Sequence, residues 1–188
     1  MAGCFQGLHP VSLLPLYDSP NRRHSFRQSA FRVSMPFRLA AILFLALTGA
    51  TQAAEIAGTA SVVDGDTIEI HGERIRFHGT DSPEGRQPCF IDGKPWRCGQ
   101  AASLALSDFL GRAAVACTVV DVDRYGRKVA VCRAHGVDVN EWTVRNGWAV
   151  AYRRYSKAYV GAEKLARRER LGLWQGEFEM PWDWRRRQ

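Results

Sequence analysis

The feature that most constrains this chain is a series of short alternating segments separated by turns. Apolar and polar residues alternate through 56–63, 67–70 and 73–79, where β-branched types are frequent. This pattern is typical of strands that bury one face. A segment rich in alanine and leucine follows at 100–110 with helical spacing, and Gly111 ends it. The first half of the domain therefore reads as three strands followed by a helix.

Two further alternating segments, 113–121 and 127–134, are followed by helical patterns at 137–146 and 159–170. Five short strands with a helix between the third and the fourth are typical of a small closed barrel of the oligonucleotide-binding type. The sequence therefore predicts an α+β, β-rich domain with a five-stranded barrel and three helices. We place this domain at 55–176, ahead of an aromatic and basic C-terminal tail.

The first part of the chain carries the pattern of a secretory signal. Residues 35–54 combine a short positive start, an apolar run of twelve residues and small residues that allow cleavage after Ala53 or Ala54. A retained membrane anchor is the alternative, but the run is shorter than the roughly 20 residues of a spanning helix. Residues 1–34 fit neither a signal nor a domain, and our hypothesis is that Met35 is the true start. We therefore expect an exported protein, periplasmic or secreted.

The net charge of +7 is unevenly placed. Residues 1–54 hold five arginines and one acidic residue, whereas residues 55–188 hold 21 basic and 18 acidic side chains. The globular part is only mildly basic, so charge alone does not establish nucleic-acid binding.

The predicted mature part keeps four cysteines: Cys89, Cys98, Cys117 and Cys132. An even count in an exported domain suggests two disulfides. A hairpin centred between residues 124 and 125 places Cys117 opposite Cys132, at a Cα separation of about 4.5–5.5 Å that suits a disulfide. Cys89 and Cys98 then remain to close the loop predicted at 85–98. Four free thiols are the alternative.

Three patches carry residues suited to chemistry: Val63-Asp64-Gly65-Asp66-Thr67, Arg76 with Asp81-Ser82-Pro83-Glu84, and Asp123-Arg124-Tyr125-Gly126-Arg127. An Asp-Gly turn alone more often marks a hairpin than a site. If the second and third strands pair, however, Asp66 and Asp81 lie at the same end of the sheet. Carboxylates brought close repel each other, and a hard cation such as calcium offsets this repulsion. Arginine matches phosphate oxygens two at a time, so the combination predicts metal-assisted cleavage of a phosphodiester.

The three patches, in this order, resemble the hallmarks of the thermonuclease-like (staphylococcal-nuclease-like) family. The resemblance continues through 139–141, 144–147 and 172–174 and covers roughly residues 56–176. It implies a calcium-dependent endonuclease, acting as a monomer on DNA and RNA with a preference for single strands, that cleaves the P–O5′ bond and leaves 3′-phosphate ends.

The resemblance also implies a role for individual residues. Asp66, Asp81 and the backbone carbonyl of Ser82 match the calcium ligands, and Asp64 matches a nearby acid that is not a direct ligand. Glu84 matches the carboxylate that orients or deprotonates the attacking water. The phosphate-holding arginines match Arg76 and Arg127, and the nucleotide pocket matches Arg124, Tyr125 and Tyr152. Ser82 replaces the usual threonine, which leaves a carbonyl ligand unchanged.

Two other functions compete with this interpretation. Barrels of this type also bind single strands without cutting them, but all five matched catalytic and metal positions are present here. An envelope protein could instead use the tryptophans and arginines of 177–188 to bind membranes or partners. We expect this tail to wrap the barrel with its tryptophans and to leave its arginines in solvent.

Overall fold

The computed structural model describes residues 54–188. The predicted upstream extension at 1–34 and the predicted signal at 35–54 lie outside this part of the chain, Ala54 excepted. Within residues 54–188, none of the helices is both long enough and apolar enough to cross a membrane.

The largest sheet follows the predicted alternation. Its strands are β1 (Glu55–Thr59), β2 (Ser61–Asp64), β3 (Thr67–Ile70), β4 (Glu73–Phe77), β8 (Ala114–Val122), β9 (Lys128–Ala134) and the short β10 (Val137–Asp138). They pair in the order β1-β8-β9-β4-β3-β2, and β10 adds to β9. All of these pairs are antiparallel except β4 with β9, which is parallel.

The two end strands of this sheet, β1 and β2, are neighbours in the chain. The segment predicted as one strand at 56–63 is interrupted at Ala60, so β1 pairs with β8 while β2 pairs with β3. Because a single residue joins the two ends, the sheet curls back on itself toward a barrel. The predicted α+β, β-rich fold of the oligonucleotide-binding type is thus confirmed.

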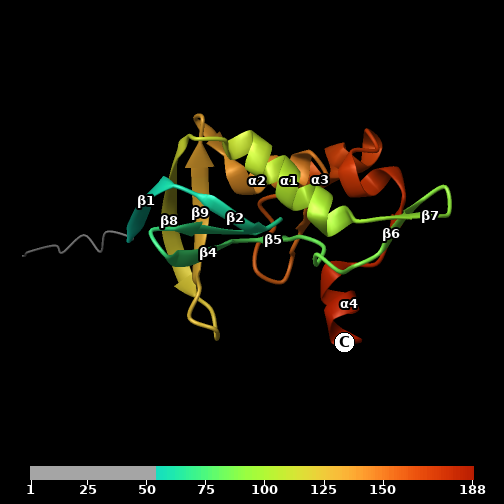
Figure 1. The fold of residues 1–188 in the computed structure, drawn as a ribbon, viewed down its shortest axis with the longest axis horizontal. Helices are drawn as coiled ribbons and strands as arrows, with labels where there is room; N and C mark the ends of the chain where they lie inside the picture. Colours follow the sequence, from blue (N-terminus) through green and yellow to red (C-terminus); the bar gives the residue numbers. More distant parts are fainter. Residues whose placement is uncertain (1–53) are drawn as a thin grey trace, which may run out of the picture. The chain divides into compact units, whose positions relative to one another are not determined.

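Helix α1 (Cys98–Leu110) covers the open side of the curled sheet and packs against β2 (Figure 1). Its buried side chains Leu106 and Leu110 join Ile68, Ile75 and Phe77 of the sheet in one apolar core. The helix begins two residues earlier than predicted and ends at Gly111, whose φ of 52° favours glycine.

Helices α2 (Val139–Arg145) and α3 (Val160–Arg168) pack together beside the sheet. The carboxylate of Asp138 caps α2 by accepting a hydrogen bond from the Glu141 amide at 2.9 Å. The short strand β11 (Val150–Ala151) lies between the two helices in the chain and pairs with β5 (Thr80–Asp81). This pairing connects the helical part to the segment that follows β4.

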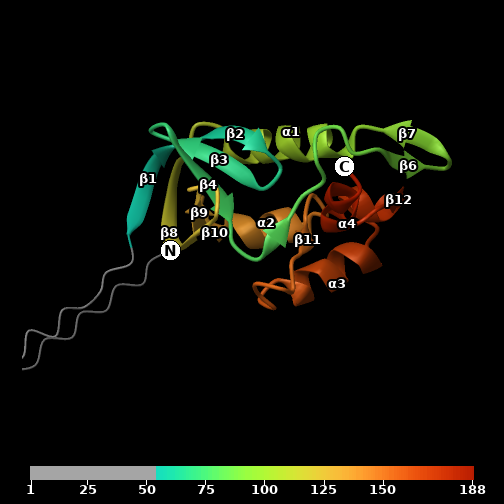
Figure 2. The same cartoon turned by 90° about the horizontal axis from the view of Figure 1, so that it is seen from below.

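The C-terminal region is folded onto the segment 85–98, and here two expectations were wrong. The predicted loop at 85–98 contains a hairpin of β6 (Cys89–Ile91) and β7 (Lys94–Trp96), to which β12 (Glu177–Phe178) adds. A 3₁₀ helix (Gly172–Gln175) ends the predicted domain, and the predicted tail forms a fourth α-helix, α4 (Pro181–Arg186), beyond the three expected. Figures 1 and 2 show α4 close to β6, away from β1 and β8.

Both predicted disulfides are formed. Cys117 and Cys132 are directly opposed in the β8–β9 register, with Cα atoms 4.0 Å apart, and their sulfurs lie in the main core. Cys89 and Cys98 join the β6–β7 hairpin to the start of α1, with Cα atoms 5.8 Å apart. This second disulfide packs with Trp96, Met180 and Trp182, so it links the hairpin to the C-terminal region.

Candidate active site

The turn before β3 and the segment after β4 meet as the sequence predicted. Antiparallel pairing places Thr67 opposite Arg76, and the Phe77 amide donates to the carbonyl oxygen of Asp66 at 2.8 Å. The Ser82 amide donates to Oδ2 of Asp66 at 3.0 Å. A Cβ atom at Gly65 would lie 2.1 Å from the Ser82 hydroxyl oxygen, so this close approach requires glycine. Asp66 and Asp81 therefore lie at one end of the sheet.

Arg76 bridges these two carboxylates. Its Nη1 donates to Oδ1 of Asp66 at 3.0 Å, and its Nη2 lies 2.8 Å from Oδ2 of Asp66 and 2.6 Å from Oδ1 of Asp81. Side-chain exposure is 18% for Arg76, 4% for Asp66 and 0% for Asp81. The site therefore holds a largely buried ion-pair network in which two carboxylates converge on one nitrogen.

Glu84 is far more accessible than Asp66 and Asp81, with 38% of its side chain exposed. Its backbone rests on the first turn of α1, because a Cβ atom at Gly99 would lie 2.3 Å from the Glu84 carbonyl oxygen. The backbone amide of the buried Gln87 donates to that carbonyl oxygen at 2.9 Å, and the side-chain oxygen of Gln87 accepts from the backbone amide of Glu84 at 3.4 Å. The helix start and this loop thus determine where Glu84 lies.

Arg185 of α4 also belongs to the site, which sequence reasoning missed. Its Nη2 lies 2.7 Å from Oδ2 and 3.0 Å from Oδ1 of Asp81, and its Nη1 donates to Oε1 of Glu84 at 2.8 Å. The expectation that the tail arginines are solvated is wrong for Arg185. It holds for Arg186 and Arg187, which are exposed and pair with acidic residues of their own segment. The sequence held one signal for this position. Trp182 and Arg185 follow Pro181 and are one helical turn apart, which places them on the same face of a helix.

The electrostatics of the site are dominated by its acids. Burial and the charge of Asp66 raise the pKa of Asp81 to about 6, although Arg185 and Arg76 both act to lower it. Burial and the same neighbouring charge raise the pKa of Asp64 to about 7. Four carboxylates face two guanidinium groups here, so the ionised site has an excess of negative charge that a cation would offset.

These residues fit a hard divalent cation by their chemistry. Every donor is oxygen: two buried carboxylates that already approach a common positive atom, and a neighbouring backbone carbonyl. Calcium takes such ligands at 2.3–2.6 Å and completes its shell with water. Within residues 54–188, no group of three His, Cys, Asp or Glu side chains is arranged as a metal cage. In the structure, arginines bind the carboxylates that would hold the ion.

Arg127 lies apart from this network, just before β9. Its Nε and Nη2 bind Oδ2 of Asp123 at 2.8 and 2.7 Å, within the hairpin loop between β8 and β9. The parallel register places Val129, two residues further on, opposite Arg76. Asp123 accepts hydrogen bonds from the side chain and backbone of Arg127 and from the Tyr125 amide. Although partial burial acts to raise it, these hydrogen bonds hold the pKa of Asp123 below its usual value. The structure therefore orders the third patch beside β4 without joining Arg127 to the carboxylates.

The residues predicted for the nucleotide pocket divide into two groups. Tyr125 is 69% exposed and packs under the guanidinium groups of Arg124 and Arg127, at 4.8 and 5.6 Å from its ring centre. Tyr152 instead stacks on Trp182 of α4, with ring centres 5.1 Å apart and planes 12° apart. The C-terminal helix thus covers one face of the ring that the prediction assigned to a base or sugar.

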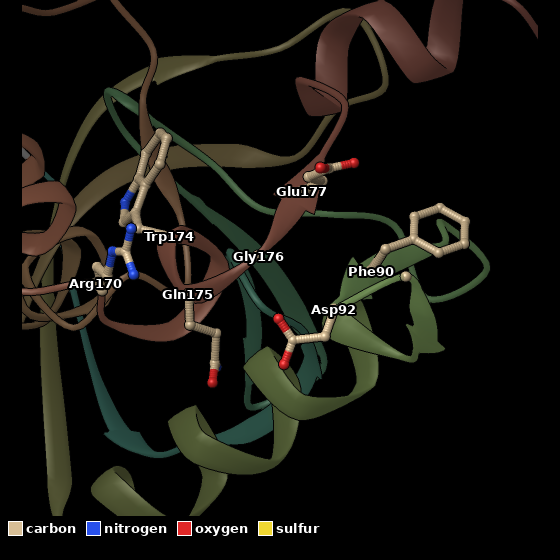
Figure 3. A pocket seen from close by; sticks show the side chains of 8 residues that line it. Phe90, Asp92, Arg170, Trp174, Gln175, Gly176 and Glu177 are labelled. Atoms are coloured by element: carbon tan, nitrogen blue, oxygen red, sulfur yellow. The ribbon is translucent and has the colours of Figure 1, made fainter.

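Two surface hollows in the described part of the chain lie elsewhere. One, of about 300 Å³, is lined by the turn of the β6–β7 hairpin and the segment around the 3₁₀ helix, including Asp92, Arg170 and Trp174 (Figure 3). The other, of about 380 Å³, lies between Phe90 on one side and Trp184 of α4 and the following Arg187 on the other. Neither is lined by a predicted site residue.

Comparison with known proteins supplies the family context. The profile described as "Staphylococcal nuclease homologue" matches residues 74–176. The chain is 41% identical over 145 residues to the succinoglycan biosynthesis protein ExoI of Rhizobium meliloti (strain 1021), covering 75% of each chain. It is 35% identical over 143 residues to a micrococcal nuclease of Shigella flexneri, covering 66% of this chain and 77% of the relative. An uncharacterized endonuclease of Escherichia coli O157:H7 is 34% identical over 134 residues, with 67% and 82% covered.

Proposed function

Because this chain belongs to the staphylococcal nuclease homologue family, we propose that it is a calcium-dependent endonuclease that hydrolyses phosphodiester bonds of DNA and RNA. The resemblance seen in the three patches is confirmed by this membership. A phosphodiester-hydrolysing nuclease is also what the names of the Shigella flexneri and Escherichia coli relatives indicate. The Rhizobium meliloti relative is named for a process and not for a reaction, so its name does not compete with this assignment.

The observation that carries the proposal is the convergence of Asp66, Asp81 and Arg76 at one end of the sheet, with Glu84 at its edge. Asp66, Asp81 and the Ser82 carbonyl would hold the calcium ion. When bound, the ion stabilises the negative charge that develops on the phosphoryl oxygens. Arg76, within reach of the same position, would hold a phosphate oxygen.

Glu84 is suited to the attacking water because its carboxylate is partly exposed while Asp81 is fully buried. We assign to Glu84 the orientation of the water and the acceptance of its proton as the water oxygen bonds to phosphorus. The P–O5′ bond then breaks, and the departing 5′ oxygen takes a proton from solvent. Arg127 would hold a second phosphate oxygen, and Arg124, Tyr125 and Tyr152 the nucleotide.

A noncatalytic oligonucleotide-binding module is the second candidate, because the curled sheet is a binding scaffold in its own right. The two functions differ in one assay. Denatured DNA is incubated with the protein in calcium or in chelator, and the Glu84→Gln variant is compared with Glu73→Gln, an exposed carboxylate on β4. We expect digestion by the wild type and by Glu73→Gln in calcium only, and a loss of roughly 10²–10³-fold in Glu84→Gln. Equal digestion in every condition, or none in any, would reject the proposed enzyme.

Substrate preference and oligomeric state are tested with the same material. We propose that single-stranded DNA and RNA are cut faster than duplex DNA, that the products end in 3′-phosphates, and that the protein is a monomer. Rates on the three substrates, end-group analysis of the products and size-exclusion chromatography measure these points. Faster cleavage of duplex DNA or a dimer of constant mass would contradict them.

Export of the protein remains a proposal as well. The two disulfides support it, since such bonds persist in oxidising compartments. Cell fractionation and mass spectrometry of the processed chain test it. Recovery of a chain in the cytoplasm that retains residues 35–54 would count against export.

A further inference from the structure

The C-terminal helix places a cation on Asp81, one of the two carboxylates assigned to calcium. The Arg185 guanidinium contacts both oxygens of Asp81 and one oxygen of Glu84, at 2.7–3.0 Å. With Arg76 at 2.6 Å from Oδ1, each oxygen of Asp81 has a guanidinium donor. The guanidinium contact with Glu84 involves a carboxylate that we assign to the attacking water and not to the ion.

Two guanidinium groups therefore already occupy the oxygens of Asp81. A calcium ion must come within 2.3–2.6 Å of a ligand oxygen, while the Arg185 nitrogen lies 2.7 Å from Oδ2 and 3.0 Å from Oδ1. Arg76 and Arg185 already share Oδ1 of Asp81, so a calcium ion on this carboxylate would be a third positive group beside it and would be repelled by both guanidinium groups. Of the two arginines, Arg185 is the one placed to leave, because its side chain is 35% exposed, whereas that of Arg76 is 18% exposed and is also bound to Asp66.

We propose that Arg185 is an active-site residue that takes the place of the calcium ion on Asp81, so that its side chain must leave Asp81 before the ion can bind. This inference rests on the proposed function, because it assumes that Asp81 is a calcium ligand. Arg185 then lowers the affinity for calcium and stabilises the ion-free site.

The exchange requires only the end of one side chain to move. Other contacts hold the backbone of α4 in place without Arg185. Pro181 is buried and Trp182 stacks on Tyr152. Just before the helix, the carbonyl of Glu179 accepts a hydrogen bond from the side-chain amide of Gln87 at 2.6 Å. The Arg185 side chain is 35% exposed, so solvent is available to its guanidinium when it leaves. Calcium binding therefore leaves α4 in place.

The test is calcium binding measured by titration calorimetry on the whole protein, with calcium chloride as the probe. Arg185→Gln removes the competing charge and is expected to bind calcium about tenfold more tightly than the wild type, a size typical of coupling between two sites. Arg186→Gln is the matched control, since the neighbouring side chain is 74% exposed and pairs only with Asp183 of its own helix. It is expected to match the wild type.

A second readout does not depend on binding heat. In chelator, Arg185→Gln is expected to unfold at a lower temperature than the wild type, and saturating calcium is expected to raise its midpoint more. If Arg185→Gln does not fold, Arg185→Lys takes its place in the titration. A lysine keeps one charge but cannot span Asp81 and Glu84 with two nitrogens. We therefore expect Arg185→Lys to bind calcium more tightly than the wild type, but by less than tenfold.

The results separate this inference from the proposed function. Equal or weaker calcium binding by Arg185→Gln and Arg185→Lys, beside a wild type that binds calcium and digests DNA, would overturn the exchange and leave the nuclease assignment intact. A wild type that digests DNA equally well in chelator, or that does not bind calcium, would overturn both the calcium dependence and the exchange.

Discussion

Arg76 offers a direct test of how the site is held together. Replacing Arg76 by methionine keeps most of its apolar stem and removes the guanidinium group. Three contacts of 2.6–3.0 Å to Asp66 and Asp81 are then lost. Because those carboxylates are 4% and 0% exposed, the loss leaves buried charge without its partner, which typically costs about 3–5 kcal/mol.

Partners that remain place the expected loss at the lower end of that range. Asp66 still accepts hydrogen bonds from the Ser82 amide and the Thr67 hydroxyl, and Asp81 still contacts Arg185. We therefore expect the free energy of unfolding in chelator to fall by about 3 kcal/mol. With an m-value of about 2 kcal/mol/M, the urea midpoint falls by about 1.5 M.

The same strand provides the control. Arg74 is 62% exposed, and its nearest acidic contact is Glu69 at 3.8 Å. Arg74→Met is expected to change the free energy of unfolding by less than about 0.5 kcal/mol. Urea unfolding followed by tryptophan fluorescence measures both variants in chelator and again in calcium, where the ion is expected to reduce the loss in Arg76→Met. Loss of no more than 0.5 kcal/mol in Arg76→Met would refute the view that this arginine neutralises buried carboxylates.

Two further outcomes follow from other parts of the fold. Replacing Cys117 and Cys132 together by alanine removes a link between residues 15 apart and should lower the free energy of unfolding by about 3 kcal/mol in the same urea assay; unchanged stability would contradict it. Asp64→Asn should be more stable than the wild type above pH 7 in chelator. Folding raises the pKa of the Asp64 carboxyl to about 7, so this group stabilises the folded state while it is protonated. That contribution is lost as the pH rises through 7, and the asparagine variant does not lose it. Thermal unfolding from pH 4 to pH 8 measures this, and a difference independent of pH would show that Asp64 is not the group that titrates.

Local rules were sufficient to predict much of the barrel and part of the site. Strand alternation and turn residues located β3, β4, β8 and β9 to within about two residues. The symmetry of one hairpin was enough to pair Cys117 with Cys132, even though the register shifts by one residue between Val119 and Asp121, closer to the turn. Asp66 and Asp81 were brought together by the same reasoning, because antiparallel neighbours with short turns determine which ends meet.

The β6–β7 hairpin was missed although its signal was present. Asp92 and Gly93 both have positive φ, 50° and 72°, as a two-residue hairpin turn requires. Pro95 argued against a strand, but β7 is an edge strand of its small sheet, where a missing amide donor is tolerated. The prediction of a loop was therefore wrong because a proline excludes a central strand but not an edge strand.

Local rules could place Arg185 one helical turn from Trp182, but they could not bring it to Asp81 and Glu84. It contacts residues 101 and 104 positions earlier in the chain, and no periodic pattern connects segments at that distance. The contact depends on β12 pairing with β6 and on α4 packing against Tyr152, which are both tertiary events.

The close approach of Gly99 to Glu84 limits how this protein can vary. A methyl group at position 99 would meet the Glu84 carbonyl carbon and oxygen at 2.6 and 2.3 Å, so even alanine would push the loop away from the helix. The same displacement would carry the Glu84 carboxylate with it while every charged group stayed chemically intact. Position 99 therefore constrains the reaction through volume alone, and a redesign that preserved all acids and arginines but added one carbon there would alter the site.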